Sequence, residues 1–186
     1  MIYLDNAATT LYKPRAVEQA VRRAMYGAAG YARGGYAAAN RAGELVYACR
    51  EQAAALFGLS DPARVIFTLN ATHALNIAIN ALVKPDSRVI VSGYEHNAVM
   101  RPLTARNIEP TVLDTPLWDG AAMVSALKQA LEHGADLMIL SHVSNVFGSI
   151  APLDEIAELL TAAGVPLILD ASQSAGVAGV DVKRYP

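Results

Sequence analysis

Short apolar runs alternate with longer amphipathic stretches from about residue 64 onward. Runs rich in Val, Ile and Leu, each bounded by polar residues or Gly, predict strands at 64–68, 88–92, 111–115, 136–141 and 166–171. The stretches between them predict helices at 72–83, 97–106, 119–134 and 152–164. Strands that are apolar on both faces and alternate with helices are typical of a mostly parallel sheet covered on both sides. We therefore predict an α/β fold with helices on both faces of the sheet.

The N-terminal part follows a different pattern. Residues 14–26 have helical periodicity, an Ala/Gly-rich stretch at 26–40 indicates a flexible loop, and a second helix is predicted from about 41 to 57. These patterns divide the chain into an N-terminal segment, residues 1–40, and a partial α/β domain, residues 41–186.

Composition and charge exclude several classes of partner. Hydrophobic residues make up 53% of the chain and charged residues 17%, which predicts a large buried fraction or a surface that another chain covers. The net charge of -2, without a basic stripe, argues against nucleic acid and anionic membranes as partners. No apolar run is long enough to span a bilayer, and the first ten residues lack the features of a signal peptide. The single cysteine, Cys49, forms no internal disulfide and indicates a reducing compartment, so we expect a cytoplasmic protein.

Polar residues collect directly after four of the five predicted strands. Ligands of parallel α/β sheets bind at the carboxyl ends of the strands, so these residues are candidates for one crevice. The segments, in chain order, are "LNATHALN", "YEHNAV", "HVSNVFG" and "ASQSAG".

Three of these segments carry residues with a functional and a structural interpretation. Thr72 is a candidate helix N-cap, and the free amides of such a helix start suit a phosphate, although Thr72 would also cap a helix that binds nothing. His96 can stack on a flat ring or act as an acid or base; alternatively, it is a partly buried histidine bonded to the backbone. Asn145 can donate to an oxygen on a ring, or it forms an Asx turn before the next helix.

The fourth segment begins with a carboxylate at the end of a buried strand. Such a group is costly unless it is paired, and a protonated pyridine nitrogen is a suitable partner for Asp170. The alternative is that Asp170 caps a helix. Gln173 lies three residues on and can reach a phenolic oxygen of the same ring. Together these segments supply the groups of a pocket for pyridoxal phosphate: a helix start that suits a phosphate, an imidazole that can stack on a ring, an amide and a carboxylate.

A metal site is not expected. His73, His96 and His142 follow predicted strands, but no cysteine or paired carboxylate completes a zinc ligand set near them.

Four stretches carry a family resemblance over essentially the whole chain. They are "YLDNAATT", "FTLNATHALN", "EHNAV" and the segment from Ser141 to Gly176, which contains both "SHVSNVFGSIAPLDEIAELL" and "LILDASQSAG". Together they resemble the class V aminotransferase group of pyridoxal phosphate enzymes, and most closely the cysteine desulfurases and selenocysteine lyases. The resemblance implies the large domain of the fold type I transferases. It also implies cysteine or selenocysteine as substrate, a sulfur-acceptor protein and a homodimer.

The resemblance also implies roles for individual residues. Ala71 and Thr72 would hold the cofactor phosphate at a helix start. His96 would stack on the pyridine ring and act as the catalytic group that moves protons. Asn145 would lie near the ring oxygen and the substrate.

Further along the chain, Asp170 would pair with the pyridine nitrogen and Gln173 would contact the ring oxygen. The "DNAATT" segment, residues 5–10, would lie beside the substrate, and Arg33 falls in a loop that approaches the active site in such enzymes.

The sequence departs from the family pattern in its lysines and its cysteine. The family's cofactor lysine stands in a Ser/Thr-Gly-His-Lys motif, which none of the lysines matches, whether Lys13, Lys84, Lys128 or Lys183. Cys49 is predicted to be a buried apolar residue of a helix rather than the persulfide-forming cysteine. We therefore expect that the natural protein continues beyond this chain and that the chain alone is inactive. The alternatives are another class V enzyme (an aminotransferase, an epimerase or a kynureninase-like hydrolase) and a non-catalytic fragment or interaction module.

Overall fold

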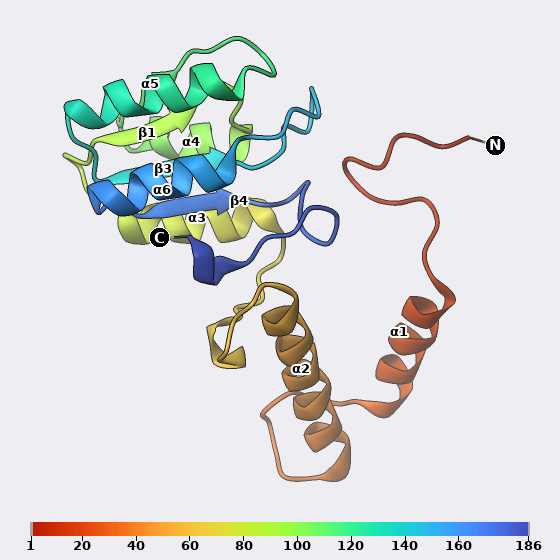
Figure 1. Ribbon diagram of the computed structural model, residues 1–186. Coiled ribbons are helices and arrows are strands. Elements are labelled where there is room, and N and C mark those ends of the chain that lie inside the picture. Colours follow the sequence, from red (N-terminus) through yellow and green to blue (C-terminus); the bar gives the residue numbers. More distant parts are fainter. Residues whose placement is uncertain (1, 186) are drawn as a thin grey trace. The chain divides into compact units, whose positions relative to one another are not determined.

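A parallel sheet of four strands forms the centre of the C-terminal part of the chain in the computed structural model, which describes residues 2–185 (Figure 1). The strands are β1 (Val89–Ser92), β2 (Thr111–Leu113), β3 (Leu137–Ser141) and β4 (Leu167–Asp170). Their order in the sheet is β2-β1-β3-β4, and all three neighbouring pairs are parallel. The predicted α/β fold is confirmed.

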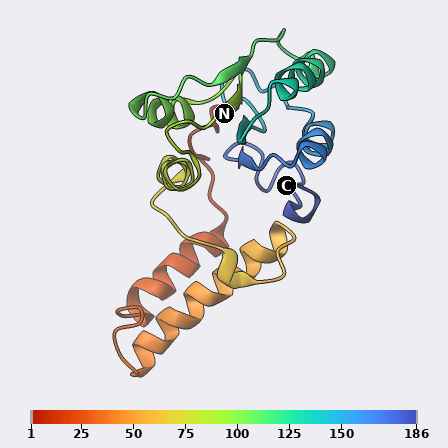
Figure 2. The ribbon, with the colours of Figure 1, turned by 90° about the vertical axis from the view of Figure 1, so that its left-hand side faces the viewer.

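Helices cover both faces of this sheet. They are α3 (Ala71–Leu82), α4 (Asn97–Ala105), α5 (Gly120–Glu132) and α6 (Leu153–Ala163). Figure 2 shows the yellow-to-green helices α3 and α4 on one side of the sheet and the teal and blue helices α5 and α6 on the other. A short 3-10 turn, η2 (Val182–Arg184), follows β4. Each predicted helix of this part is present, with its ends within two residues of the prediction.

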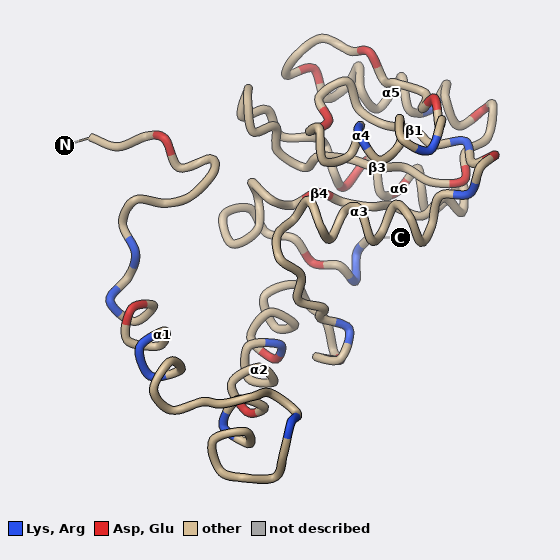
Figure 3. The backbone as a smooth tube through the Cα atoms, turned by 180° about the vertical axis from the view of Figure 1, so that it is seen from behind, with Lys and Arg blue, Asp and Glu red and all other residues tan. Residues whose placement is uncertain are grey.

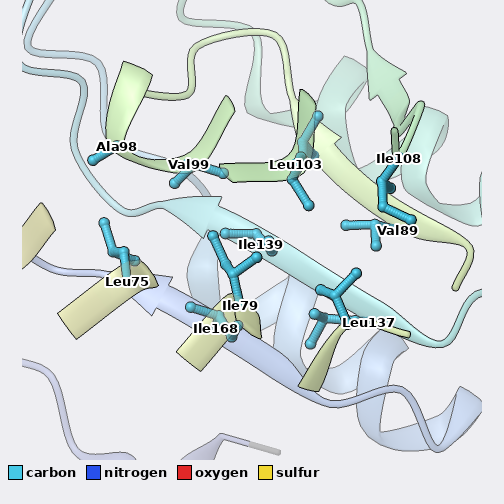
Figure 4. Packing of buried hydrophobic residues seen from close by; sticks show 12 residues of the cluster. Leu75, Ile79, Val89, Ala98, Val99, Leu103, Ile108, Leu137, Ile139 and Ile168 are labelled. Atoms are coloured by element: carbon cyan, nitrogen blue, oxygen red, sulfur yellow. The ribbon is translucent and has the colours of Figure 1, made fainter. Parts of the chain in front are cut away.

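Alternation along the strands sends neighbouring side chains to opposite faces. The strand residues that pack with α3 and α4 are Val89, Val91, Leu137, Ile139 and Ile168 (Figure 4). Those that pack with α5 and α6 are Ile90, Leu113, Met138 and Leu140. Both faces of the central strands are therefore filled with apolar side chains, and polar groups are confined to the strand ends.

Capping residues set the ends of the helices. α6 begins after Pro152, with Asp154 and Glu155 in its first turn, where acidic side chains are stabilised by the helix dipole. It ends at Gly164, whose φ of 66° lies in the left-handed region that favours glycine.

The chain divides into two compact units between Ile66 and Phe67. The first unit contains α1 (Arg15–Gly27), α2 (Ala37–Leu56) and a 3-10 turn, η1 (Pro62–Arg64). The domain boundary predicted at residue 40 falls within α2. The Ala/Gly-rich loop is correspondingly shorter than predicted, because its last alanines form the first turn of this helix.

Two sequence predictions in the first unit and at its end are wrong. Residues 64–68 are not a strand: Arg64 ends η1, and Val65 is extended without a partner strand among the described residues. A strand is stable only when its backbone is paired, and apolar composition alone does not supply a partner. Cys49 is exposed rather than buried. The buried face of α2 includes Ala42 and Ala54, and Cys49 does not lie on that face.

Charged residues are scattered along the chain without a block of one sign (Figure 3). Within residues 2–185, no helix has the length and apolar character that crossing a bilayer requires.

We predict that Ile139→Ala destabilises the chain by about 2–5 kcal/mol, because this side chain is fully buried in a central strand and its truncation leaves a cavity. Ile77→Ala is the matched control, since Ile77 on α3 is 50% exposed and should change the unfolding free energy by about 0.5 kcal/mol. Urea denaturation followed by circular dichroism measures both variants. Equal losses in the two variants would contradict the assignment of the core.

We also predict that this chain self-associates in solution. β4 lies at an edge of the described sheet, and several large apolar side chains of the second unit are more than 60% exposed: Leu69, Trp118, Val146, Ile150 and Val177. Exposed apolar surface and unpaired strand edges favour association with another chain. Sedimentation velocity over a range of concentrations tests this, and a single monomeric species throughout would show the prediction to be wrong.

Candidate functional site

The order of the strands places a topological switch point between β1 and β3. From β1 the chain passes outward to β2, and it then returns to the other side of β1 to form β3 and β4. Ligands of open α/β sheets bind at such a reversal, beyond the carboxyl ends of the strands. The residues that end these strands are Ser92, Ser141 and Asp170.

Asp170 ends β4 beside Ser141, its register partner on β3. Because it lies two residues after Ile168, its side chain points to the sheet face that α3 and α4 cover. Its Oδ1 atom accepts hydrogen bonds from the amide of Ser172, at 3.0 Å, and from the hydroxyl of Ser172. Asp170 therefore closes a turn and does not cap a helix. Both of these hydrogen bonds are accepted by the same oxygen, Oδ1.

Helix α3 begins with two free amides. Its N-cap is Asn70, whose Oδ1 accepts from the amide of His73 at 2.9 Å, so the prediction that Thr72 is the N-cap is wrong. Thr72 instead lies in the first turn, next to Ala71. Within residues 2–185 neither of their two amides has an acceptor, and both residues are exposed. Such amides suit an anion.

His96 is the N-cap of α4. Its Nδ1 accepts from the amide of Ala98 at 3.0 Å, which leaves the proton of the neutral imidazole on Nε2. The ring is exposed, and it lines the same concave surface as Thr72. Asn76 and Arg101 also line this surface. The structure thus brings together the starts of α3 and α4.

The other predicted site residues lie apart from this concave surface. Asn145 is exposed in a turn that Ser144 closes. The Ser144 hydroxyl accepts hydrogen bonds from the amides of Val146 and Phe147. Ser144, and not the predicted Asn145, therefore forms the capping bonds of that turn. Gln173 is partly buried in the turn after β4.

Residues 5–10 and Arg33 belong to the first unit and are exposed.

A side chain that the sequence analysis did not assign, Glu95, joins the ends of the two central strands. Its Oε1 accepts from the hydroxyl of Ser92 at 2.6 Å and from the amide of Ser141 at 2.9 Å, and its Oε2 accepts from the hydroxyl of Ser141 at 2.7 Å. Burial raises the pKa of the Glu95 carboxyl; the nearby Asp170 adds to this rise, and the hydrogen bonds oppose it. The sequence contained a signal for this link, because the acid Glu95 follows a strand that ends in Ser92 and a second strand ends in Ser141.

A further histidine, His142, lies directly after β3. His142 is buried, with its Nδ1 lacking a hydrogen-bond partner, and burial lowers its pKa. In the described residues no group of His, Cys, Asp and Glu side chains is arranged to hold a metal ion.

Comparison with known proteins supplies the family. The profile of the aminotransferase class V family matches residues 2–186. The chain belongs to this class V family. Two curated relatives are the cysteine desulfurases IscS of Vibrio cholerae and of Shewanella loihica. Each is 35% identical to this class V chain over 98% of its length.

Solved structures agree with this assignment. The apo cysteine desulfurase of Thermococcus onnurineus NA1 superposes with a TM-score of 0.87 at 26% identity and covers 98% of the chain. The cysteine desulfurase CsdA of Escherichia coli superposes with a TM-score of 0.76 at 26% identity and covers 96%. The class V chain spans 47% of the length of each of these two proteins and of the curated relatives, which is about half.

We predict that Glu95→Gln becomes more stable relative to the wild type as the pH rises. A carboxyl with a raised pKa contributes stability that is present in full below its ordinary value of about 4.5 and is lost as the pH rises through the folded pKa. Glutamine is neutral throughout and keeps the shape of the protonated acid. Urea denaturation from acidic to neutral pH should therefore show a growing advantage for the variant.

The control for this pH dependence is Glu109→Gln, which changes an exposed acid. Its difference from the wild type should stay nearly constant over the same pH range. A Glu95→Gln difference that is equally flat would show that burial does not perturb the Glu95 carboxyl.

Proposed function

We propose that this chain forms the cofactor-binding part of a pyridoxal phosphate enzyme that removes sulfur from cysteine. The observation that carries the proposal is the position of the Asp170 carboxylate, which is partly buried at the carboxyl end of β4, beside Ser141 and on the sheet face of α3 and α4. A partly buried carboxylate is suited to a charged N–H group, such as that of a protonated pyridine.

The donors and acceptors at the strand ends fit the cofactor. Asp170 would accept the proton of the ring nitrogen, and the free amides of Ala71 and Thr72 would donate to the phosphate, together with the Thr72 hydroxyl. When bound, pyridoxal phosphate supplies an electron sink that stabilises negative charge developing on the substrate. The family assignment supports this cofactor, because class V enzymes as a group use it.

His96 has the chemistry for a catalytic role beside the ring. Its Nδ1 is held by the amide of Ala98, so the ring is fixed in one orientation with its Nε2–H directed away from the helix. We propose that His96 stacks on the cofactor and moves protons to and from the substrate. Asn145 and Gln173 are proposed to contact the ring oxygen, and Asn145 also the substrate.

The relatives favour desulfuration among the class V reactions. The curated relatives and the two superposed structures are all cysteine desulfurases, and no observation favours an aminotransferase, an epimerase or a kynureninase-like hydrolase. A selenocysteine lyase would use the same residues. We further propose that the complete enzyme is a cytoplasmic homodimer that passes sulfur to an acceptor protein.

We predict that Asp170→Ala weakens the binding of pyridoxal phosphate by roughly 10- to 150-fold, because a hydrogen bond to a charged group contributes about 1.5–3 kcal/mol. Asp170→Asn should weaken binding nearly as much, since an amide cannot neutralise the ring nitrogen. The measurement is an equilibrium titration of the chain with the cofactor, followed by absorbance. Asp86→Ala, in an exposed turn, is the control and should bind like the wild type.

Wild-type affinity in both Asp170 variants would exclude Asp170 as the partner of the ring nitrogen. The reaction itself is tested in the complete natural protein by cysteine-dependent release of sulfide and formation of alanine. Cofactor binding without either product would favour one of the other class V reactions. Absence of binding would favour the non-catalytic interaction module.

A further inference from the structure

The connection between β1 and α4, residues 93–96, is bonded to the strands on both sides of β1. Toward β2, the amide of Gly93 donates to the carbonyl of Leu113 at 3.2 Å, and the hydroxyl of Tyr94 donates to the carbonyl of Thr115. Toward β3, the carboxyl group of Glu95 accepts hydrogen bonds from the amide and the hydroxyl of Ser141. The four-residue connection is therefore fixed across the carboxyl edge of the sheet, and Glu95 supplies its contact with β3.

Glu95 forms a more specific link than a surface ion pair. Its two oxygens take three hydrogen bonds, one from the end of β1 and two from the end of β3. The side chain is mostly buried, and so is Ser92. Hydrogen bonds to a carboxylate in such surroundings are short and directional, so they restrict the position of the residue that carries it.

The residue directly after Glu95 is His96. The carbonyl oxygen of His96 accepts hydrogen bonds from the amides of Val99 and Met100, at 2.9 and 3.3 Å. The Nδ1 atom of the His96 ring accepts a hydrogen bond from the amide of Ala98. These bonds fix the imidazole relative to α4, but they do not fix the start of α4 relative to β3. The bonds between Glu95 and Ser141 make that connection.

We propose that Glu95 is a positioning residue, which fixes His96 over the cofactor site by tying the start of α4 to the end of β3. The cofactor part of this inference rests on the proposed function. The link also reaches Asp170, because Ser141 is the register partner of Asp170 on β4. Glu95 thus fixes the positions of His96 and Asp170, two of the proposed cofactor-binding residues, relative to each other.

According to the proposal, the hydrogen bonds of the Glu95 side chain position His96, and its negative charge does not. Glutamine at position 95 can accept from Ser92 and from the Ser141 amide through its oxygen, and it can donate to the Ser141 hydroxyl through its nitrogen. Alanine can make none of these bonds. Glu95→Gln should therefore preserve the position of His96, and Glu95→Ala should not.

The experiment has one readout without the cofactor and one with it. In the cofactor-free chain, the carbon-bound proton signals of the His96 ring are followed by NMR and assigned by their loss in His96→Gln. We expect them to shift or broaden in Glu95→Ala and to stay at the wild-type position in Glu95→Gln. In titrations with pyridoxal phosphate, we expect a roughly tenfold higher Kd for Glu95→Ala and a change of about twofold or less for Glu95→Gln.

Two further variants complete the series. Ser141→Ala removes one of the three donors and should give a smaller shift of the His96 signals than Glu95→Ala, and it serves in place of Glu95→Ala if that variant does not fold. Glu109→Ala removes an exposed acid and should leave both readouts unchanged.

Wild-type His96 signals in folded Glu95→Ala and in Ser141→Ala would overturn the proposal. So would a Glu95→Gln variant as impaired as Glu95→Ala, because that result would assign the effect to charge. If the wild-type chain does not bind pyridoxal phosphate, the proposed function fails, and the NMR readout alone decides whether Glu95 positions His96.

Discussion

Burial of both faces of the parallel sheet is the constraint on which the rest of the second unit depends. Ile139 and Met138 are neighbours on β3, face opposite layers of helices, and are both fully buried. A polar side chain at either position would lie in an apolar layer without a partner. Functional groups are therefore restricted to the strand ends, and parallel strands bring their carboxyl ends to the same edge.

The two ends of the central strands are linked in physically different ways. At the amino ends, the side chain of Arg88 forms an exposed ion pair with Asp136, and such a pair is screened by water and contributes little. At the carboxyl ends, Glu95 is mostly buried and bonded to Ser92 and Ser141. The link at the end that carries the proposed site is thus the more buried one, and buried hydrogen bonds are less exposed to competition from water.

Patterns that depend on neighbours in the sequence were predicted well. Helical periodicity located α3 to α6, and the apolar runs located all four strands of the sheet. The same reasoning selected Asp170, because a carboxylate that ends a buried strand needs a partner wherever that strand lies. It did not select the correct cap of α3, since Asn70 and Thr72 are both good N-cap residues and the direction from which the chain enters the helix decides between them.

The sequence by itself determined the class of fold, the strand ends at which polar groups collect and the family to which the motifs point. These follow from periodicity and from local residue chemistry. Only the tertiary structure decided that residues 64–68 have no partner strand within residues 2–185 and that Glu95 contacts Ser141, 46 residues away along the chain. Pairing between strands and contacts between side chains distant in sequence depend on the order of the strands in space. Local patterns of apolar and polar residues do not encode that order.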